Sequence, residues 1–407
     1  RLYLQLDVDL PQDWKLRTSG YGYYDAAYRI NGRSDYTDDV LDTHEYDFEL
    51  MDTYIEGAVH EKVDVKLGRQ VVNWGRSETF RILDIINPID NREPGLTDIE
   101  DTRRPLGMLR VGWFHGPWTL TALVIPEIRY DHLPGQGSDQ SPGIGDDLPT
   151  DPVGVMAFCD GELSGEASDI CGDVFAYLGS LGPLDPSDPI DLCHHREKDF
   201  GPSSEYALNL TGVFSGWDAS LQAAVYNNDT AHFDLKDRRF EHARLWMVGA
   251  GANYTYGSWL FKAELAFSDG YEFLWTSDEK SRLDAMVGLE YYGINDVNIA
   301  FEVSETHLFD FEEETELFLD FAQEDTIQSA LRVTYDMWND QLHFTVLGLV
   351  VGEKAQDGSL VRLSAEYDVI DAFSVEGGFL LFQDGDSIFL DGAGDNDRFF
   401  ASAKYSF

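Results

Sequence analysis

Segments in which apolar and polar side chains alternate recur along the chain, and they constrain the fold more than any other feature. The clearest of them are residues 245–254, 259–267, 283–291, 297–303, 327–335 and 342–350. In the second, Trp259, Phe261 and Leu265 share one face, whereas Lys262 and Glu264 share the other. Alternation with a period of two predicts β-strands that have one apolar and one polar face.

Short turns and long polar connections alternate between these segments. Tight turns are expected at 60–61, 115–117, 215–216, 256–257, 293–296, 339–340 and 370–371. Long connections are expected at 31–45, 74–104, 131–202, 228–241, 268–281, 305–325, 352–358 and 384–396. Outer-membrane barrels have short turns on one side and long loops on the other. We therefore predict an all-β fold: a single transmembrane antiparallel β-barrel over residues 1–407, with long extracellular loops, in the bacterial outer membrane.

The number of strands follows from the same reading. Sixteen strands lie between Trp14 and Phe407, and residues 2–9 add one more. Single-chain bacterial barrels close with an even number of strands. We therefore expect 18 strands in the native chain, the first of them upstream of Arg1. Alternatively, residues 2–9 are not a full strand and the barrel has 16.

Residues 399–407 (FFASAKYSF) place aromatic side chains on one face up to the last residue. This ending resembles the carboxy-terminal signal that the outer-membrane insertion machinery reads, with Tyr405 and Phe407 as its main residues. The apolar face of such a strand meets lipid. We therefore expect the insertion machinery, outer-membrane lipid and lipopolysaccharide as partners.

Composition excludes several classes of protein. Mean hydropathy is -0.30, and no run approaches the roughly 18 apolar residues of a spanning helix. The net charge of -46 comes from 75 acidic and 29 basic residues, and such a field repels nucleic acid. The acids concentrate in the connections. They indicate either a solvated acidic surface or Ca²⁺ sites in the loops, with Asp391, Asp395 and Asp397 as candidate ligands, although the EF-hand spacing is absent. No other cofactor is expected.

The cysteines, Cys159, Cys171 and Cys193, all lie in the long extracellular insertion 131–202. In an oxidising compartment two would pair and one would remain. The sequence leaves all pairings open. Cys193 is followed by His194 and His195, but this run lacks the paired spacing of a zinc site.

The connection 75–104 is too apolar for a loop in water. Phe80, Leu83 and Ile86 have helical spacing up to Pro88, so we expect the segment to fold inward as a plug or constriction. A bulge at Gly68 would turn Arg69 inward as well. The predicted lining comprises Arg69, Arg76, Arg81, Asp84, Asp90, Arg92, Glu93, Arg103 and Arg104, together with the strand residues Glu264, Glu290, Glu302, Arg332, Arg362 and Glu366.

The same block resembles a proteobacterial outer-membrane family, the domain of unknown function thirteen-oh-two, which is distantly similar to alginate-export porins. The resemblance is carried by GRQVVNWG at 68–75, FRILD at 80–84, INP at 86–88 and REP at 92–94. A weaker match is DWKL at 13–16 followed by YYDAAY at 23–28. The resemblance implies an outer-membrane barrel that works beside envelope export partners, and it carries over no catalytic residues.

Three functions fit this pattern. The first is a channel or export conduit gated by the 75–104 loop. Excess acid in its lumen predicts cation preference, unless the arginines only neutralise buried acids. The second is a structural or partner-binding barrel without an open pore. The third is a barrel hydrolase using a loop histidine, but no nucleophile motif accompanies the candidates, and we expect no enzyme activity. The candidate histidines are His194, His195, His232, His242 and His307.

Overall fold

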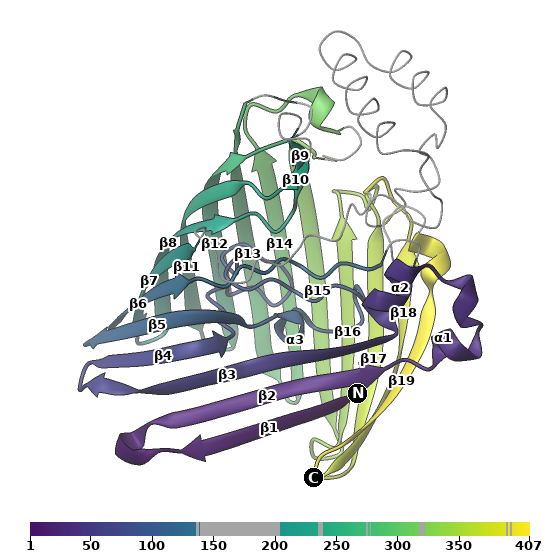
Figure 1. The fold of residues 1–407 in the computed structure, drawn as a ribbon, viewed down its shortest axis with the longest axis horizontal. Helices are drawn as coiled ribbons and strands as arrows, with labels where there is room; N and C mark the ends of the chain where they lie inside the picture. Colours follow the sequence, from purple (N-terminus) through teal and green to yellow (C-terminus); the bar gives the residue numbers. More distant parts are fainter. Residues whose placement is uncertain are drawn as a thin grey trace.

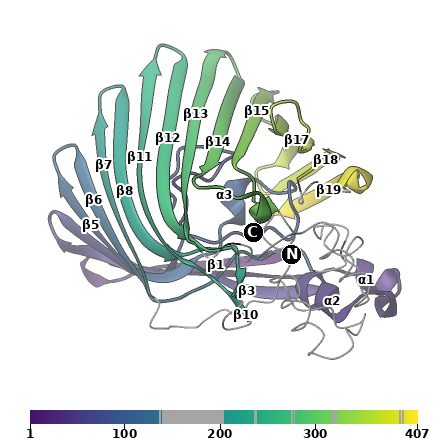
Figure 2. The same ribbon diagram turned by 90° about the horizontal axis from the view of Figure 1, so that it is seen from above.

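The computed structural model describes residues 1–135, 138, 204–234, 239–273, 276, 278–316, 322–387, 390 and 393–407. Over these residues, seventeen strands form one antiparallel sheet in which strands adjacent in the sequence pair with each other. Figure 1 shows the sheet curled around a central space, and Figure 2 shows it from above. The strands are β1 (Leu2–Asp9), β2 (Lys15–Tyr24), β3 (Tyr46–His60), β4 (Val63–Gln70), β5 (Leu106–His115), β6 (Trp118–Ile125), β7 (Glu205–Phe214), β8 (Trp217–Asn227), β11 (Arg244–Tyr256), β12 (Trp259–Tyr271), β13 (Lys280–Ile294), β14 (Val297–Leu308), β15 (Asp325–Met337), β16 (Leu342–Val351), β17 (Ser359–Ile370), β18 (Phe373–Gln383) and β19 (Arg398–Tyr405).

Short helices and one small hairpin lie in the connections. The helices are α1 (Ala27–Ile30), α2 (Asp38–His44) and α3 (Ile99–Thr102), with 3-10 turns η1 (Pro11–Asp13), η2 (Arg33–Asp35), η3 (Glu313–Glu316) and η4 (Ala393–Asn396). The hairpin pairs β9 (His232–Asp234) with β10 (Arg239–Glu241). Within the part of the chain that the structure describes, no helix is long and apolar enough to cross a membrane.

The predicted strands and tight turns are confirmed. Every predicted short turn separates two paired strands, as at residues 61–62 between β3 and β4 or residues 257–258 between β11 and β12. The tight turns fit the antiparallel pairing, because two antiparallel strands can be joined by a few residues. Burial of one face of the sheet then fixes the register of each pair. The fold is therefore an antiparallel β-barrel sheet of the predicted size.

The two faces of the sheet differ as the alternation requires. On β11, Trp246 and Tyr254 are exposed on the outer face, whereas Leu245 and Met247 are buried on the inner face. On β12, Phe261 is exposed on the outer face and Glu264 is buried on the inner one. An exposed apolar face over many strands suits contact with lipid, because a soluble protein rarely exposes so large an apolar patch.

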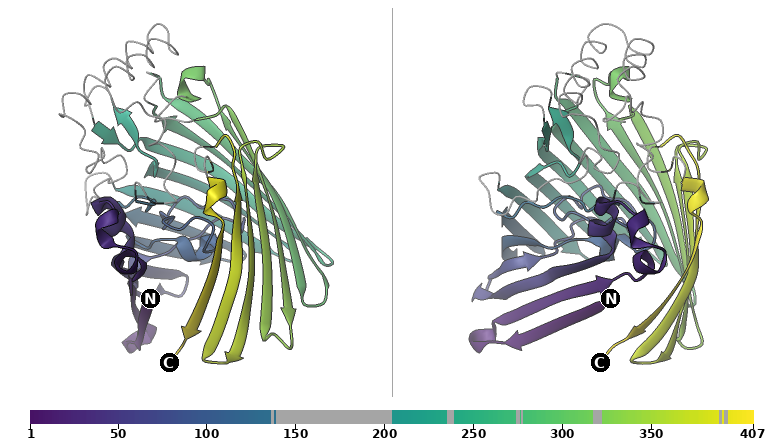
Figure 3. Two further views of the ribbon diagram at one scale, coloured as in Figure 1. Left: turned by 90° about the vertical axis from the view of Figure 1, so that its right-hand side faces the viewer. Right: turned by 45° about the vertical axis from the view of Figure 1, so that its right-hand side comes forward.

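Among the described strands, β1 is paired only with β2 and β19 only with β18, so these two strands form the edges of the sheet. Figure 3 shows them at the two ends of the curled sheet. Because every neighbouring pair is antiparallel, the first and seventeenth strands run in the same direction and cannot pair antiparallel to one another. Closure with eighteen strands stays a prediction. The terminal strand β19 ends at Tyr405, two residues before the predicted end, and Phe407 is exposed.

Candidate functional site

The connection 75–104, called the lumen segment from here on, lies on the concave side of the sheet, where Figure 2 shows α3. The helical spacing of Phe80, Leu83 and Ile86 does not correspond to a helix: residues 71–98 contain none, and α3 is the only helix between β4 and β5. Two backbone N–H groups of this stretch show why: that of Leu83 donates to the side chain of Glu264 at 3.3 Å, and that of Ile89 to the side chain of Asp131 at 2.7 Å. Side chains thus take the backbone groups that a helix would pair internally.

Apolar contacts hold the first half of the lumen segment against one side of the wall. Leu83 is fully buried, and Phe80, Ile82 and Ile86 are nearly so. They share one cluster with inner-face residues of the neighbouring strands: Leu106, Met108, Leu123, Ile125, Leu245, Met247 and Met286. The alternation predicted a polar inner face, but the inner face is not polar throughout. It is apolar where the lumen segment covers it.

Two wall carboxylates fix the tip of the segment. Glu264 on β12 accepts the backbone N–H of Arg76 and that of Leu83, the latter at 3.3 Å. Glu302 on β14 accepts the hydroxyl of Ser77 at 2.6 Å and backbone N–H groups of the next turn. Because both glutamates are buried, these are charge-assisted bonds in a site with little water.

Lys262 on β12 joins the predicted residues Glu290 and Glu302. Its ammonium contacts Glu290 and lies 3.8 Å from Glu302 and 3.6 Å from Glu78. Lys262 and Glu302 both lie opposite Gly288 in the register, so no side chain separates them. One lysine thus faces three carboxylates in this region of the wall.

The arginines of the segment are all paired. Arg76 donates to Asp218 at 2.7 Å and to Ser220 at 2.8 Å on β8. Asp84 accepts from Arg103 at 2.8 Å and lies 3.6 Å from Arg81. Both arginines and Asp84 have little exposure, which makes this a buried ion cluster inside the segment.

The second half of the segment is attached to β2 and β3. Arg92 bonds Asp90 at 2.6 Å, lies 3.0 Å from Asp47 on β3, and donates to the Tyr23 hydroxyl at 2.9 Å. Arg104 lies 3.3 Å from Glu49 on β3. The lumen segment is therefore held on this side of the sheet by hydrogen bonds and ion pairs.

Opposite strands hold the same part of the segment. The Asp98 carboxylate accepts from Arg332 on β15 at 2.8 Å and from Arg362 on β17 at 3.0 Å. Glu93 accepts from Arg398 on β19 at 2.8 Å. Asp98 precedes α3 but makes no capping bond with its side chain, which is engaged by the two arginines instead. Contacts to β2, β3, β8, β12, β14, β15, β17 and β19 mean that the segment crosses the central space.

Two predicted lining residues, Arg69 and Glu366, form no hydrogen bond or ion pair with the lumen segment among the described residues. Arg69 binds Glu127 and the carbonyl of Leu50, not the lumen segment. The predicted bulge at Gly68 is wrong, because the register runs unbroken through Gly68 on both sides, although its φ is 127°. Glu366 lies on the inner face of β17, opposite Glu376 and His343.

Sequence reasoning missed the wall and segment partners Asp98, Lys262, Glu49, Asp218 and Arg398. A usable signal existed only for Lys262, which shares the inner face of β12 with Glu264. Each of the other four lies far in sequence from its own partner, as Arg398 does from Glu93, and no local pattern links the two.

Two cavities adjoin the segment. One, the lumen cavity, has a volume of about 240 Å³ and lies among Tyr21, Tyr23, Glu49, Asp90, Arg92 and Arg103. The other, the mouth cavity, has a volume of about 390 Å³ and lies among Tyr28, Ser138, Asp395, Asp397 and Arg398. His44 and Glu93 line both.

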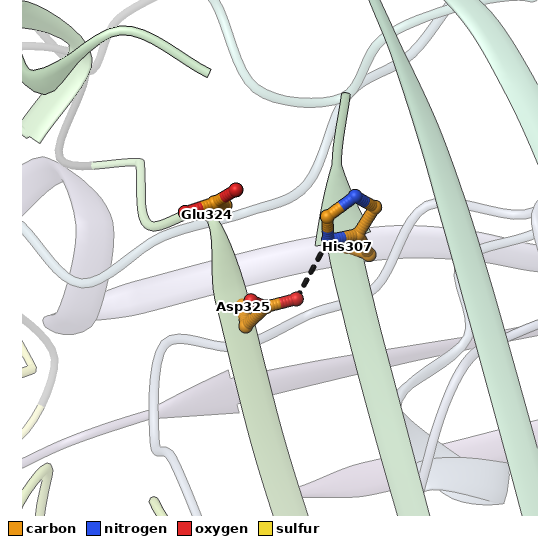
Figure 4. A group of neighbouring side chains, drawn as sticks. All are labelled: His307, Glu324 and Asp325. Carbon is orange, nitrogen blue, oxygen red and sulfur yellow. Dashed lines mark hydrogen bonds and ion pairs between the residues drawn. The ribbon is translucent and has the colours of Figure 1, made fainter. Parts of the chain in front are cut away.

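The candidate histidines that the structure describes, and the candidate ligand Asp397, have partners outside the lumen segment. Figure 4 shows His307 with Asp325, 2.6 Å apart, and Glu324 beside them. Among the described residues this is the one group of three or more side chains whose spacing could hold a metal ion, so Asp395 and Asp397 belong to no such group. Asp397 instead accepts the N–H of Phe382 at 2.8 Å.

The other histidines have ordinary polar partners. His232 lies 3.4 Å from Glu272, and His242 contacts the carbonyl of Asn228 at 2.6 Å. Outside the described residues lie Asp391, Cys159, Cys171, Cys193, His194 and His195, with nearly all of the 131–202 insertion. Ca²⁺ binding, the disulfide and the insertion stay predictions.

Comparison with known proteins found similar solved structures and one matching family. The structure of OccAB1 from Acinetobacter baumannii superposes with a TM-score of 0.52 at 9% identity, covering 99% of this chain and 88% of that one. OpdK from Pseudomonas aeruginosa, solved with vanillate, gives 0.47 at 11% identity, covering 98% and 90%. The outer-membrane channel DcaP of A. baumannii gives 0.44 at 11% identity, covering 89% and 79%. No curated protein matches the sequence. Residues 1–407 match one protein family over their whole length, and the chain therefore belongs to the family described as "Protein of unknown function (DUF1302)".

Proposed function

We propose that the protein is an outer-membrane channel whose lumen is gated by the lumen segment. The observation that carries this proposal is the attachment of one internal segment to opposite sides of a barrel sheet. Its second half is held by ion pairs and hydrogen bonds to Asp47, Glu49, Arg332, Arg362 and Arg398. The pairs with Arg332, Arg362 and Arg398 are partly exposed, whereas the Arg104–Glu49 pair is buried. Exposed pairs contribute less than buried ones, so the pairs with the far wall are the ones that can separate and re-form. A wall that served only as a scaffold would need no such crossing.

Cation preference follows from the charge of the inner face. Lys262 faces Glu78, Glu290 and Glu302. Glu366 and Glu376 lie opposite each other on β17 and β18. Rings of carboxylates in a pore attract cations and repel anions. The excess of acid in this part of the lumen supports a pore that prefers K⁺ to Cl⁻.

Planar-bilayer recording on the purified protein tests both parts of the proposal. We expect discrete conductance steps and, in a KCl gradient, a reversal potential whose sign shows that K⁺ permeates more readily than Cl⁻. Anion selectivity would overturn the cation preference. Absence of any step in bilayers where a known porin inserts and conducts would overturn the channel itself.

A structural or partner-binding barrel is the second candidate. The apolar cluster that joins Leu83 and Phe80 to the wall favours it, because this half of the lumen segment is packed as a core is. A closed lumen together with a partner that copurifies in fixed stoichiometry from native membranes would support it. The third candidate, a hydrolase, would require activity on phospholipid or peptide that is lost in His232→Ala or His307→Ala.

Location and partners belong to the same proposal. The exposed apolar outer face fits outer-membrane lipid and lipopolysaccharide, and the aromatic ending of β19 fits the insertion machinery. Envelope export partners would meet the barrel at its loops or turns. Fractionation of cell envelopes tests the location, since the protein should be found with outer-membrane markers.

A further inference from the structure

The lumen cavity and the mouth cavity share two lining residues. His44 from the end of α2 and Glu93 from the lumen segment line both cavities, and their side chains are 3.8 Å apart. His44 is nearly buried, whereas Glu93 is 45% exposed. The two side chains therefore form the boundary between the spaces, and Glu93 is the one with room to move.

Both residues of this contact make a second bond. Nε2 of His44 accepts the N–H of Gly135 at 3.0 Å, so the imidazole cannot turn without losing that bond. Glu93 is held by Arg398 at 2.8 Å. Breaking the Glu93–Arg398 pair would free the glutamate while its neighbour Arg92 stays bound to Asp90. The contact thus has one fixed side and one side held by a partly exposed ion pair.

The walls of the two cavities differ in charge. In the mouth cavity the carboxylates of Glu93, Asp395 and Asp397 face one arginine, Arg398. Such an acidic excess concentrates cations. The lumen cavity has arginines and carboxylates in similar number, with the rings of Tyr21 and Tyr23. A wall of both signs suits a solute that carries both donors and acceptors, and it disfavours an apolar one.

We infer that small hydrophilic solutes with a cationic group, such as amino acids or amines, cross the barrel beside the lumen segment, through the mouth cavity and then the lumen cavity. Glu93 and His44 form the restriction on this path. The volumes of about 240 and 390 Å³ are large enough to hold solutes of this size. The inference rests on the proposed channel function and names its route and solute class.

Cysteine modification during bilayer recording tests the route. In a background with the three native cysteines replaced by serine, Thr97→Cys places a thiol in the lumen cavity. Thr345→Cys is the matched control, because Thr345 lies on the inner face of β16, opposite Thr334, and lines neither cavity. The probes are methanethiosulfonates with a trimethylammonium or a sulfonate group. We expect modification of Thr97→Cys to remove most of the conductance, with the cationic probe reacting roughly tenfold faster. The control should keep its conductance.

The other outcomes separate the route from the channel function. Conductance that survives modification at Thr97→Cys but is lost at Thr345→Cys would overturn the route and leave the channel in place. Faster reaction of the anionic probe would overturn the solute class. A protein that never conducts, with or without the substitutions, would overturn the proposed function and the route with it. Glu93→Gln provides a second reading. It should move the reversal potential toward the anion side, and an unchanged potential would remove Glu93 from the path.

Discussion

The bond between Asp98 and the far wall gives the sharpest test of the lumen segment. Asp98→Asn keeps the shape of the side chain and removes the charge that Arg332 and Arg362 share. The carboxylate is 24% exposed and the two arginines 19% and 10%, so the site is neither a surface pair nor fully buried. Loss of a buried partner costs about 3–5 kcal/mol and an exposed pair contributes under about 1.

A value between these limits, about 2 kcal/mol, is expected for the detachment of the segment in this variant. It corresponds to a roughly 30-fold increase in the population of the detached state. Hydrogen exchange follows this detachment, because the N–H of Asp90 bonds the carbonyl of Thr102 at 2.7 Å and so joins the two parts of the segment that flank Asp98. That amide should exchange roughly 30-fold faster in Asp98→Asn than in the wild type.

Asp101→Asn is the matched control for this experiment. Asp101 lies in α3, the helix that follows Asp98, is exposed, and makes no ion pair with a described residue. Exchange of the Asp90 amide should be unchanged in this variant. Equal exchange in Asp98→Asn and the wild type, or equal acceleration in both variants, would refute the assignment of Asp98 as an anchor.

The remaining predictions concern packing, protonation and the second anchor. A Cβ at Gly249 would lie 2.4 Å from Leu83, so Gly249→Val should lower the free energy of unfolding by about 1–3 kcal/mol and with it the melting temperature. Gly348→Val, where a Cβ would have nothing within 4 Å, should leave the melting temperature unchanged, and equal melting of the two variants would contradict this. Burial and the nearby charges of Arg104 and Arg92 lower the pKa of the His132 imidazole from 6.5 to about 4. The unfolded chain then binds the proton first as pH falls, so stability falls below pH 6.5, by about 2 kcal/mol at pH 5. His132→Asn should lose stability less steeply on acidification, and an unchanged slope would exclude this site. Glu302→Gln should weaken the bonds to the segment tip by about 1–3 kcal/mol, seen as faster amide exchange there, and protection equal to the wild type would exclude it as an anchor.

The strands could be predicted from the sequence because each carries its own information. Alternation along β12 assigns Phe261 to the outer face and Glu264 to the inner face without knowledge of any other strand. Turn spacing then orders the strands, since sequential neighbours pair throughout. The inward course of the lumen segment was also predictable, because Phe80, Leu83 and Ile86 are too apolar for a solvated loop.

The conformation of the lumen segment and most of its partners could not be predicted. The apolar residues of this stretch have helical spacing, but wall carboxylates bind its backbone N–H groups, as Glu264 does at Leu83. Which charges meet depends on the curvature of the sheet. Asp98 and Arg362 are 264 residues apart, and nothing local to either specifies the other.

The bond between Glu93 and Arg398 has a consequence for assembly. Arg398 begins the final strand, 305 residues after Glu93, so this contact can form only when almost the whole wall exists. Neighbouring Arg92 is already held by β2 and β3 at the other end of the sheet. Adjacent residues of one segment thus bind β3 and β19, which lie near opposite edges of the sheet. We therefore expect the internal contacts to become complete only after β19 has joined the sheet.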